Sequence, residues 1–213
     1  MPSFRHPLYE KLSQYKFILG STSPRRLDIL HNNLNIKDVT IIGSSFEENL
    51  TKEGISNEEY VRQTSRGKAE SILTDFRDTS EATLILTSDT VISCNGEIFE
   101  KPGTKENQRH MFEKYHLYPD IKVITAVTIV IPDSTDPLIM QDTAITRLVF
   151  DTDCSSELVD AYINSEEGLQ VAGGFKFQEL GSLFFKGIEG DYFNVVGLPV
   201  ATTFHLLEQA VSK

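Results

Sequence analysis

Several features that mark common protein classes are scarce or missing in this sequence. Cysteine occurs only at Cys94 and Cys154, which form no CxxC motif and no metal-type spacing, so two buried free thiols in a reducing compartment are expected. Lysine and arginine number 20 against 31 acidic residues, and the net charge of −11 argues against sequence-independent binding to nucleic acid. The longest apolar stretch, residues 123–131, is too short to cross a bilayer. The polar N-terminus lacks the apolar segment of a signal peptide, so we expect a cytoplasmic enzyme or binding protein with no membrane partner.

Motifs of several enzyme classes are absent as well. No segment matches GxxxxGK[ST] or GxGxxG, so neither P-loop nor classical dinucleotide chemistry is predicted. GxSxG is missing, and none of the 5 histidines belongs to a serine or cysteine nucleophile motif. Triad-type nucleophilic catalysis is therefore poorly supported.

Segments typical of strands and of helices alternate along the 213 residues without a linker or repeat, which predicts an α/β fold of one domain or one bilobed unit. Strands are expected at residues 17–20, 39–42, 84–93, 122–131, about 140–150 and 182–188, with a hairpin turn at Asn95-Gly96. Helices are expected after Ser23, Ser56 and Thr104, over residues 155–164, and from about Pro199.

The stretch FILGSTSPRR, residues 17–26, joins a buried strand to a helix. Ser23 suits the N-cap and Pro24 suits the first helical position, where a missing N–H costs nothing. The unpaired N–H groups at such a helix N-terminus attract anions, and phosphate is a common occupant. Ser21 and Thr22 would add hydroxyl donors.

Two arginines, Arg25 and Arg26, follow in the first helical turn, where the helix dipole disfavours cations. A bound phosphate would explain them, because guanidinium groups pair bidentately with phosphate oxygens. The alternative is that both arginines are solvated or paired with some of the abundant acidic residues.

Carboxylates form the second group of candidates. Asp89 interrupts an otherwise apolar strand, where an unpaired carboxylate is costly, and it could hold a divalent metal or accept a proton from water. A structural aspartate bonded to backbone N–H groups is the alternative. Glu47 and Glu48, in the loop after the second predicted strand, could supply another metal ligand or simply be solvated.

Lys68, Lys101 and Gln178 are the remaining candidates. Lys101 precedes a proline after the predicted hairpin, and Lys68 lies on a predicted helix, where a lysine is usually solvated. Gln178 lies among apolar neighbours and could read a base edge through its amide, or could satisfy polar groups of the core.

Six motifs in order complete the sequence evidence: GSTSPRR, SFEE, RGKAES, SDTV with NGEIFEKP, AGGFKFQELGS and NVVGLPV. Together they resemble the Maf family of nucleoside triphosphate pyrophosphatases from about Phe17 to Leu207. The resemblance implies a two-lobed α/β structure, with an elongated mixed sheet flanked by helices and an active-site cleft between the lobes, similar to the inosine triphosphate pyrophosphatases. It implies one bilobed domain, commonly a homodimer, and we assign residues 1–213 to that domain. Residues 1–16 lie outside the resemblance and form an N-terminal extension that could be a docking helix.

The activity implied by the resemblance is hydrolysis of a nucleoside triphosphate to the monophosphate and pyrophosphate, with Mg²⁺ or Mn²⁺ as cofactor. Asp89 corresponds to the catalytic acid–base residue and, with Glu48, lies at the metal. The triphosphate-binding residues that carry over are Ser21, Ser23, Arg25, Arg26, Lys68 and Lys101.

Within the family the sequence looks most like the branch that acts on dTTP and UTP, whose distinguishing places are occupied here by Arg26, Thr90 and Gln178. The branch that prefers 7-methyl-GTP has a tryptophan after the proline, and this chain has no tryptophan. Lys176 and Glu179 stand where the family pattern has glycines, and both change the charge beside the presumed base pocket.

Two other functions fit the same residues. A non-catalytic nucleotide-binding regulator of cell division would bind nucleotide without turnover. A house-cleaning pyrophosphatase for modified nucleotides would share the mechanism and differ only in the base.

Overall fold

The computed structural model describes residues 4–76 and 81–212, so the first three residues of the predicted N-terminal extension lie outside the described residues. Its centre is a seven-stranded sheet with the order β2-β1-β3-β5-β6-β7, and β4 pairs with β3. The strands are β1 (Lys16–Leu19), β2 (Thr40–Ile41), β3 (Thr83–Cys94), β4 (Glu97–Phe99), β5 (Asp120–Ile131), β6 (Leu138–Phe150) and β7 (Phe185–Glu189). β1 runs parallel to β2 and β3 while the other pairs are antiparallel, so the predicted mixed α/β sheet is confirmed.

Local sequence signals account for most element boundaries. The helices are α1 (Pro7–Leu12), α2 (Pro24–Asn32), α3 (Asn57–Leu73), α4 (Lys105–Leu117), α5 (Ser156–Ser165), α6 (Tyr192–Val196) and α7 (Val200–Ala210). The Ser56 and Thr104 hydroxyls accept bonds from the N–H groups three residues on, as expected of N-caps. Asn95 and Gly96 both have positive φ, which the two-residue turn between β3 and β4 requires. Among the described helices, none is both long and apolar enough to span a bilayer.

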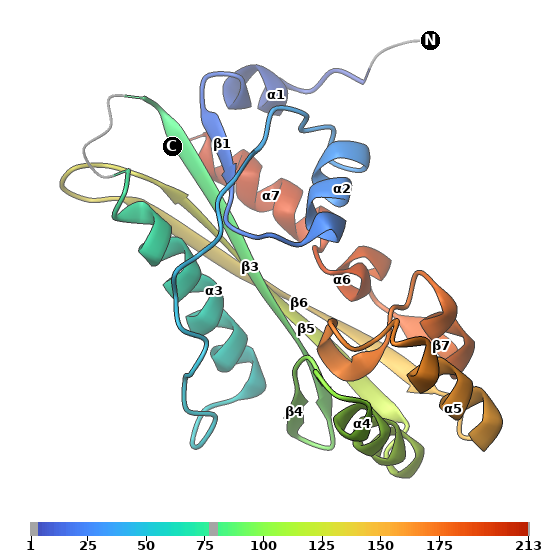
Figure 1. Ribbon diagram of the computed structural model, residues 1–213. Helices are drawn as coiled ribbons and strands as arrows, with labels where there is room; N and C mark the ends of the chain where they lie inside the picture. Colours follow the sequence, from blue (N-terminus) through green and yellow to red (C-terminus); the bar gives the residue numbers. More distant parts are fainter. Residues whose placement is uncertain (1–3, 77–80, 213) are drawn as a thin grey trace.

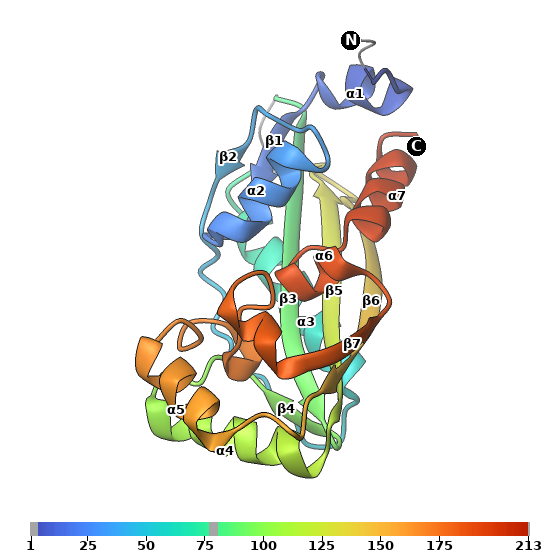
Figure 2. The ribbon, with the colours of Figure 1, turned by 90° about the vertical axis from the view of Figure 1, so that its right-hand side faces the viewer.

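The long strands β3, β5 and β6 run the length of the molecule and carry different layers on their two faces (Figure 1). On one face α3 packs against the odd-numbered side chains of β3, including Ile85 and Val91. On the other face, α1, α2 and α7 cover one end of the sheet, and α4 and α5 cover the other (Figure 2). The core under α1, α2 and α7 is mainly aliphatic, whereas the core under α4 and α5 is rich in phenylalanine and tyrosine. Each core, with the helices that cover it, forms one of the two lobes.

Between the lobes one edge of β3 has no strand partner among the described residues. β1 pairs with β3 as far as Leu86 and β4 pairs with it from Ile92 onward, so within the described chain residues 87–91 have a strand partner only on the β5 side. Because side chains alternate along a strand, Asp89 points toward α3 and Thr90 toward α2. A ligand lying along this open edge can reach both.

Two parts of the C-terminal third differ from the prediction. The strand predicted at 182–188 begins instead as a 3₁₀ turn, η2 (Leu180–Phe184), and β7 starts only at Phe185. The chain turns tightly there because Gly181 lies against Lys176, so that an added Cβ would be 2.5 Å from the Lys176 carbonyl oxygen. The helix α6 was not predicted, since five residues are too few to show helical periodicity.

The N-terminal segment is part of the fold. Leu8 and Leu12 of α1 are buried in the same cluster as Phe17 and Leu207. The helix that the sequence suggested for docking therefore docks on this chain's own core.

Candidate active site

A cavity of about 770 Å³ lies at the open edge of β3, between the two lobes. Its walls come from the β1–α2 loop, α3, the centre of β3, the loop around η1 (Ala172–Gly174) and the end of α6. Of the candidate residues from the sequence, Glu47 is exposed and does not line the cavity, whereas the others do: Ser21, Thr22, Ser23, Arg25, Arg26, Glu48, Lys68, Asp89, Thr90, Lys101 and Gln178. Positions up to 157 residues apart (21 to 178) thus meet at one place.

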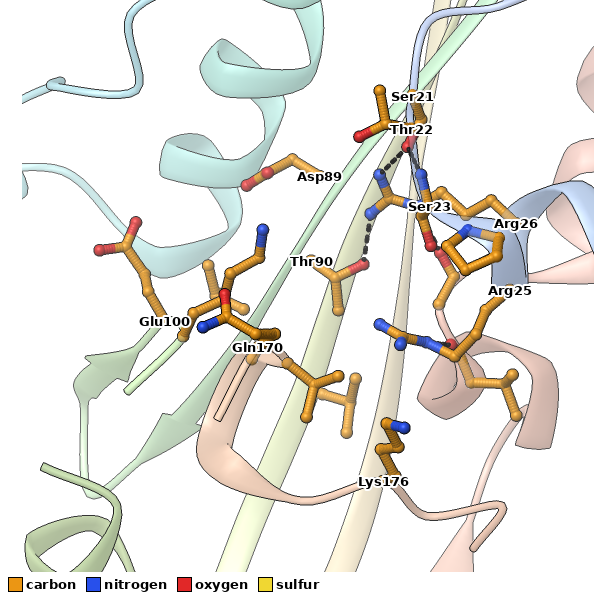
Figure 3. A pocket seen from close by; sticks show the side chains of 18 of the residues that line it. Ser21, Thr22, Ser23, Arg25, Arg26, Asp89, Thr90, Glu100, Gln170 and Lys176 are labelled. Atoms are coloured by element: carbon orange, nitrogen blue, oxygen red, sulfur yellow. Dashed lines mark hydrogen bonds between the residues drawn. The ribbon is translucent and has the colours of Figure 1, made fainter. Parts of the chain in front are cut away.

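The arginine wall is the name used here for Ser21, Ser23, Arg25 and Arg26, at the start of α2. The Ser23 side chain makes no capping bond, so the first-turn N–H groups have no side-chain cap. Ser21 Oγ accepts bonds from Ser23 N at 3.2 Å and from Arg26 Nη1 at 3.1 Å (Figure 3). The loop therefore presents hydroxyl and backbone groups to the cavity at a helix N-terminus, where an anion is favoured.

Both guanidinium groups are held by neutral oxygens. Arg26 donates from Nε to the Gly197 carbonyl at 3.0 Å and from Nη2 to Thr90 Oγ1 at 3.3 Å, and Arg25 Nε donates to the Val196 carbonyl at 3.3 Å. Burial lowers the pKa of both arginines, and for Arg25 the charge of Glu179 partly offsets that effect. Over residues 4–76 and 81–212, neither arginine makes an ion pair.

The alternative expectation, that Arg25 and Arg26 are solvated or paired with acidic residues, is therefore wrong. Both are partly buried, and α6 covers them by supplying the carbonyl groups. A buried cation without a counter-ion is costly, so this wall is complementary to an anion that the chain itself does not provide.

The carboxylate wall is the name used here for Glu48, Lys68 and Asp89. Lys68 Nζ lies 2.7 Å from Asp89 Oδ1 and 2.9 Å from Glu48 Oε1. The Asp89 and Lys68 side chains are only 10% and 11% exposed, whereas Glu48 is 52% exposed. Lys68 is thus not a solvated lysine, and the bond that holds Asp89 comes from an ammonium group and not from a backbone turn.

The donors of the carboxylate wall suit a hard divalent cation. Mg²⁺ is usually held by one or two carboxylates together with substrate phosphates, and Glu48 and Asp89 offer two carboxylates around one point. No group of three or more histidine, cysteine, aspartate or glutamate side chains able to hold a metal occurs among the described residues. The carboxylate wall therefore fits a metal that is bound partly by these carboxylates and partly by the phosphates of a substrate.

Two lining residues were missed from the sequence. Glu100 accepts bonds from Tyr60 Oη at 2.8 Å and from Lys52 Nζ at 2.7 Å, and it lies beside the carboxylate wall. Burial opposes its ionisation, but these two bonds outweigh it, and the pKa of Glu100 lies below its usual value. Its only sequence signal was its place next to Lys101. Gln170, which also lines the cavity, gave no sequence signal at all.

The remaining end of the cavity is mostly apolar. Val123, Phe175 and Val195 line it together with Gln178, which is partly buried. Lys101 is exposed at the opening and has no partner within the described part of the chain. Flat apolar surfaces with one amide suit a ring that carries a few polar atoms.

Comparison with known proteins gives a consistent set of relatives. A family model described as "Maf-like protein" matches residues 16–210. The dTTP/UTP pyrophosphatase of Saccharomyces cerevisiae is 40% identical over 208 residues, which cover 90% of this chain and 89% of that protein. The dTTP/UTP pyrophosphatase of Schizosaccharomyces pombe is 32% identical over 97% of this chain and 88% of its own length. Among solved structures, a HAM1 protein from Coxiella burnetii aligns with 93% of this chain and 97% of its own, at 13% identity and a TM-score of 0.48.

Proposed function

The chain belongs to the Maf family, and on that basis we propose that it hydrolyses nucleoside triphosphates, dTTP and UTP first among them, to the monophosphate and pyrophosphate. The yeast relatives that carry this activity in their names support the proposal. The observation that carries it is the pairing of the two walls: partly buried arginines without a carboxylate partner lie across one cavity from a buried aspartate. Cleavage of a polyanion by water needs both elements.

The arginine wall would hold the triphosphate. Arg25 and Arg26 keep guanidinium N–H groups for phosphate oxygens, and the first turn of α2 adds its dipole. The fold has already removed water from these cations, so a phosphate group gains a stronger interaction there than it would at an exposed arginine. Lys101, at the opening, would assist from the other side.

Asp89 would act as the acid–base residue. Lys68 fixes its Oδ1, which leaves Oδ2 to accept a proton from a water molecule. As that proton moves, the water oxygen bonds to the α-phosphorus, the bond from phosphorus to the bridging oxygen breaks, and pyrophosphate leaves with the electron pair. In such a reaction the protein mainly positions the groups and compensates charge.

Glu48 and Asp89 are the residues that would hold Mg²⁺ or Mn²⁺. The metal would neutralise phosphate charge when bound. Lys68 contacts the same two carboxylates, so it keeps them close together and limits their repulsion.

Gln178 would read the pyrimidine edge through its amide. Thr90 would contribute through Arg26, because its Oγ1 lies 3.3 Å from Arg26 Nη2 and 2.9 Å from Thr125 Oγ1. The bond to Thr125 fixes the Thr90 hydroxyl, which accepts from Arg26 and so helps to position the guanidinium group.

Separate quantification of each product tests the proposal. The purified protein is incubated with Mg²⁺ or Mn²⁺ and a panel of canonical and modified nucleoside triphosphates, and pyrophosphate, monophosphate and orthophosphate are measured. We expect equimolar pyrophosphate and monophosphate from UTP and dTTP, with turnover lowered about 10³-fold or more in Asp89→Asn. Near wild-type turnover by a folded Asp89→Asn variant would contradict the role of Asp89.

The same assay separates the other candidate functions. Tight binding without product from any nucleotide would identify a regulator, and preferred turnover of a modified base would identify a house-cleaning enzyme. We further propose a single bilobed domain that acts as a cytoplasmic homodimer without a nucleic-acid partner, which light scattering of the purified protein would test for the dimer.

A further inference from the structure

Lys176 is presented to the cavity by a well-fixed piece of backbone. Its N–H donates to the buried Tyr162 hydroxyl at 2.9 Å, and its carbonyl accepts from Glu179 N at 3.1 Å. Gly181 packs against the same peptide so closely that a Cβ would be 2.5 Å from the Lys176 carbonyl oxygen. The side chain of Lys176 therefore starts from a rigid platform, and it lies near Arg25 at the apolar end of the cavity (Figure 3).

Charge at this end of the cavity is not balanced. Lys176 Nζ lies 3.5 Å from Glu179 Oε1, and this long contact is its one ion pair among the described residues. Glu179 is also the carboxylate whose charge acts on Arg25. One half-exposed carboxylate thus serves two cations, so hydrogen-bond donors remain for a ligand.

The surroundings of Lys176 favour a base over a phosphate. Ser21 and Asp89, beside which the reacting phosphorus must lie, are at the other end of the cavity from Lys176, and the Arg25 guanidinium group lies between them and Lys176 (Figure 3). Lys176 follows Phe175, which packs in one apolar cluster with Val123, and Gln178 stands two residues further along. A donor among apolar walls recognises a ring with carbonyl oxygens.

We propose that Lys176 is a specificity-determining residue that donates a hydrogen bond to the 4-carbonyl oxygen of the bound base, and so favours uracil and thymine over cytosine, which carries an amine at that position. Uracil and thymine carry two carbonyl groups. Cytosine replaces one of them by an amine, which is itself a donor and cannot accept from an ammonium group. The inference rests on the proposed function, since it presumes a pyrimidine nucleoside triphosphate in the cavity.

The test compares Lys176→Met with the wild type for UTP and CTP. We expect kcat/KM for UTP to fall about 10- to 100-fold, as for loss of one hydrogen bond from a charged donor, and kcat/KM for CTP to change less than about 3-fold. Lys176→Arg should recover most of the preference for UTP. Lys105→Met is the matched control, because Lys105 pairs with Glu166 on the surface and does not line the cavity.

Equal losses for UTP and CTP would show that Lys176 contacts a group that both nucleotides share, such as the phosphates, and would overturn the inference. No loss for either nucleotide would overturn it too. The affinities of α,β-imido analogues of UTP and CTP are measured alongside by calorimetry, and the same ratio is expected to fall. If the wild type released no pyrophosphate from any nucleotide, the proposed function would fail, and this affinity ratio would still decide the role of Lys176.

Discussion

On the carboxylate wall, Lys68 Nζ lies within 2.9 Å of both Glu48 and Asp89, whereas on the arginine wall, within the described chain, Arg25 and Arg26 donate only to carbonyl and hydroxyl oxygens. Both walls carry charge that is partly removed from water. The charges of the first wall form ion pairs with one another, whereas among the described residues the arginines form none and are offset only by the charges of carboxylates that they do not contact.

This difference distinguishes charges that stabilise the fold from charges that are available to bind a ligand. In a buried ion pair, the attraction between the two charges offsets much of the free energy lost on leaving water. If one partner is removed, the other stays buried without a counter-ion, and the fold is strongly destabilised. A buried charge without a partner costs the folded state from the start, and that cost is recovered only when an anion binds. Removing a cation from the arginine wall should therefore lower activity strongly and stability little. Removing the cation of the carboxylate wall should lower stability strongly.

Arg26→Met should show the largest effect, and mainly on activity. The variant loses a guanidinium group that we propose binds the phosphates, so we expect kcat/KM for UTP to fall about 10³-fold or more. Stability without ligand should fall by less than about 1 kcal/mol, because an uncompensated buried cation is removed along with its bonds to Ser21, Thr90 and Gly197. Steady-state kinetics and urea unfolding measure the two quantities.

Arg109→Met is the matched control for that experiment. Arg109 is an exposed arginine paired with Asp160 on the surface, and we expect it to leave kcat/KM within about 2-fold. Destabilisation of Arg26→Met by several kcal/mol would contradict the comparison, because it would show that the arginine wall is built for the fold.

Lys68→Met should lower the free energy of unfolding much more than Arg26→Met does. Removing the ammonium group leaves Asp89 buried and close to Glu48 without a cation, so the free energy of unfolding should fall by about 3 kcal/mol. Urea unfolding at neutral pH measures this value. Because the loss comes from an unpaired carboxylate, adding Asp89→Asn to Lys68→Met should restore at least half of it.

A double variant no more stable than Lys68→Met would contradict that explanation. Lys68 would then stabilise the fold through the packing of its aliphatic chain on α3. Substitutions on the two walls would differ only in their effect on activity.

The sequence predicted those parts of the molecule that local rules decide. Ser56 and Thr104 begin their helices because their hydroxyl groups cap them, and the run at 84–93 forms β3 because apolar residues flank its polar centre and both of its faces are buried. The residues of the site also came from motifs and from a family resemblance, and the fold brings them together. Distances between distant segments were beyond reach: nothing local to Lys68 indicates that it lies between two carboxylates.

Glu100 shows the same limit on a smaller scale. Its two partners, Lys52 and Tyr60, come from the preceding loop and from α3, and only the tertiary fold brings them to it. The 3₁₀ turn at 180–184 likewise depends on the close approach of Gly181 to Lys176, which no pattern of apolar residues encodes.

The smallest effect is expected at the border of the carboxylate wall, where Tyr60→Phe removes one hydrogen bond to Glu100. Glu100 keeps its bond to Lys52 and is 42% exposed, so the free energy of unfolding should fall by about 0.5–1 kcal/mol and kcat/KM should change less than about 3-fold.

Because the folded-state pKa of Glu100 is lowered, the stability it contributes is present at neutral pH and is lost as pH falls through that pKa. Urea unfolding at pH 7 and at about pH 3 should therefore show the difference from wild type at pH 7 and a smaller one at the lower pH, with the exposed Tyr118→Phe as the unaffected control. A difference that is the same at both pH values would mean that Tyr60 stabilises the fold through its ring alone, and that Glu100 does not belong to the compensated charge of this wall.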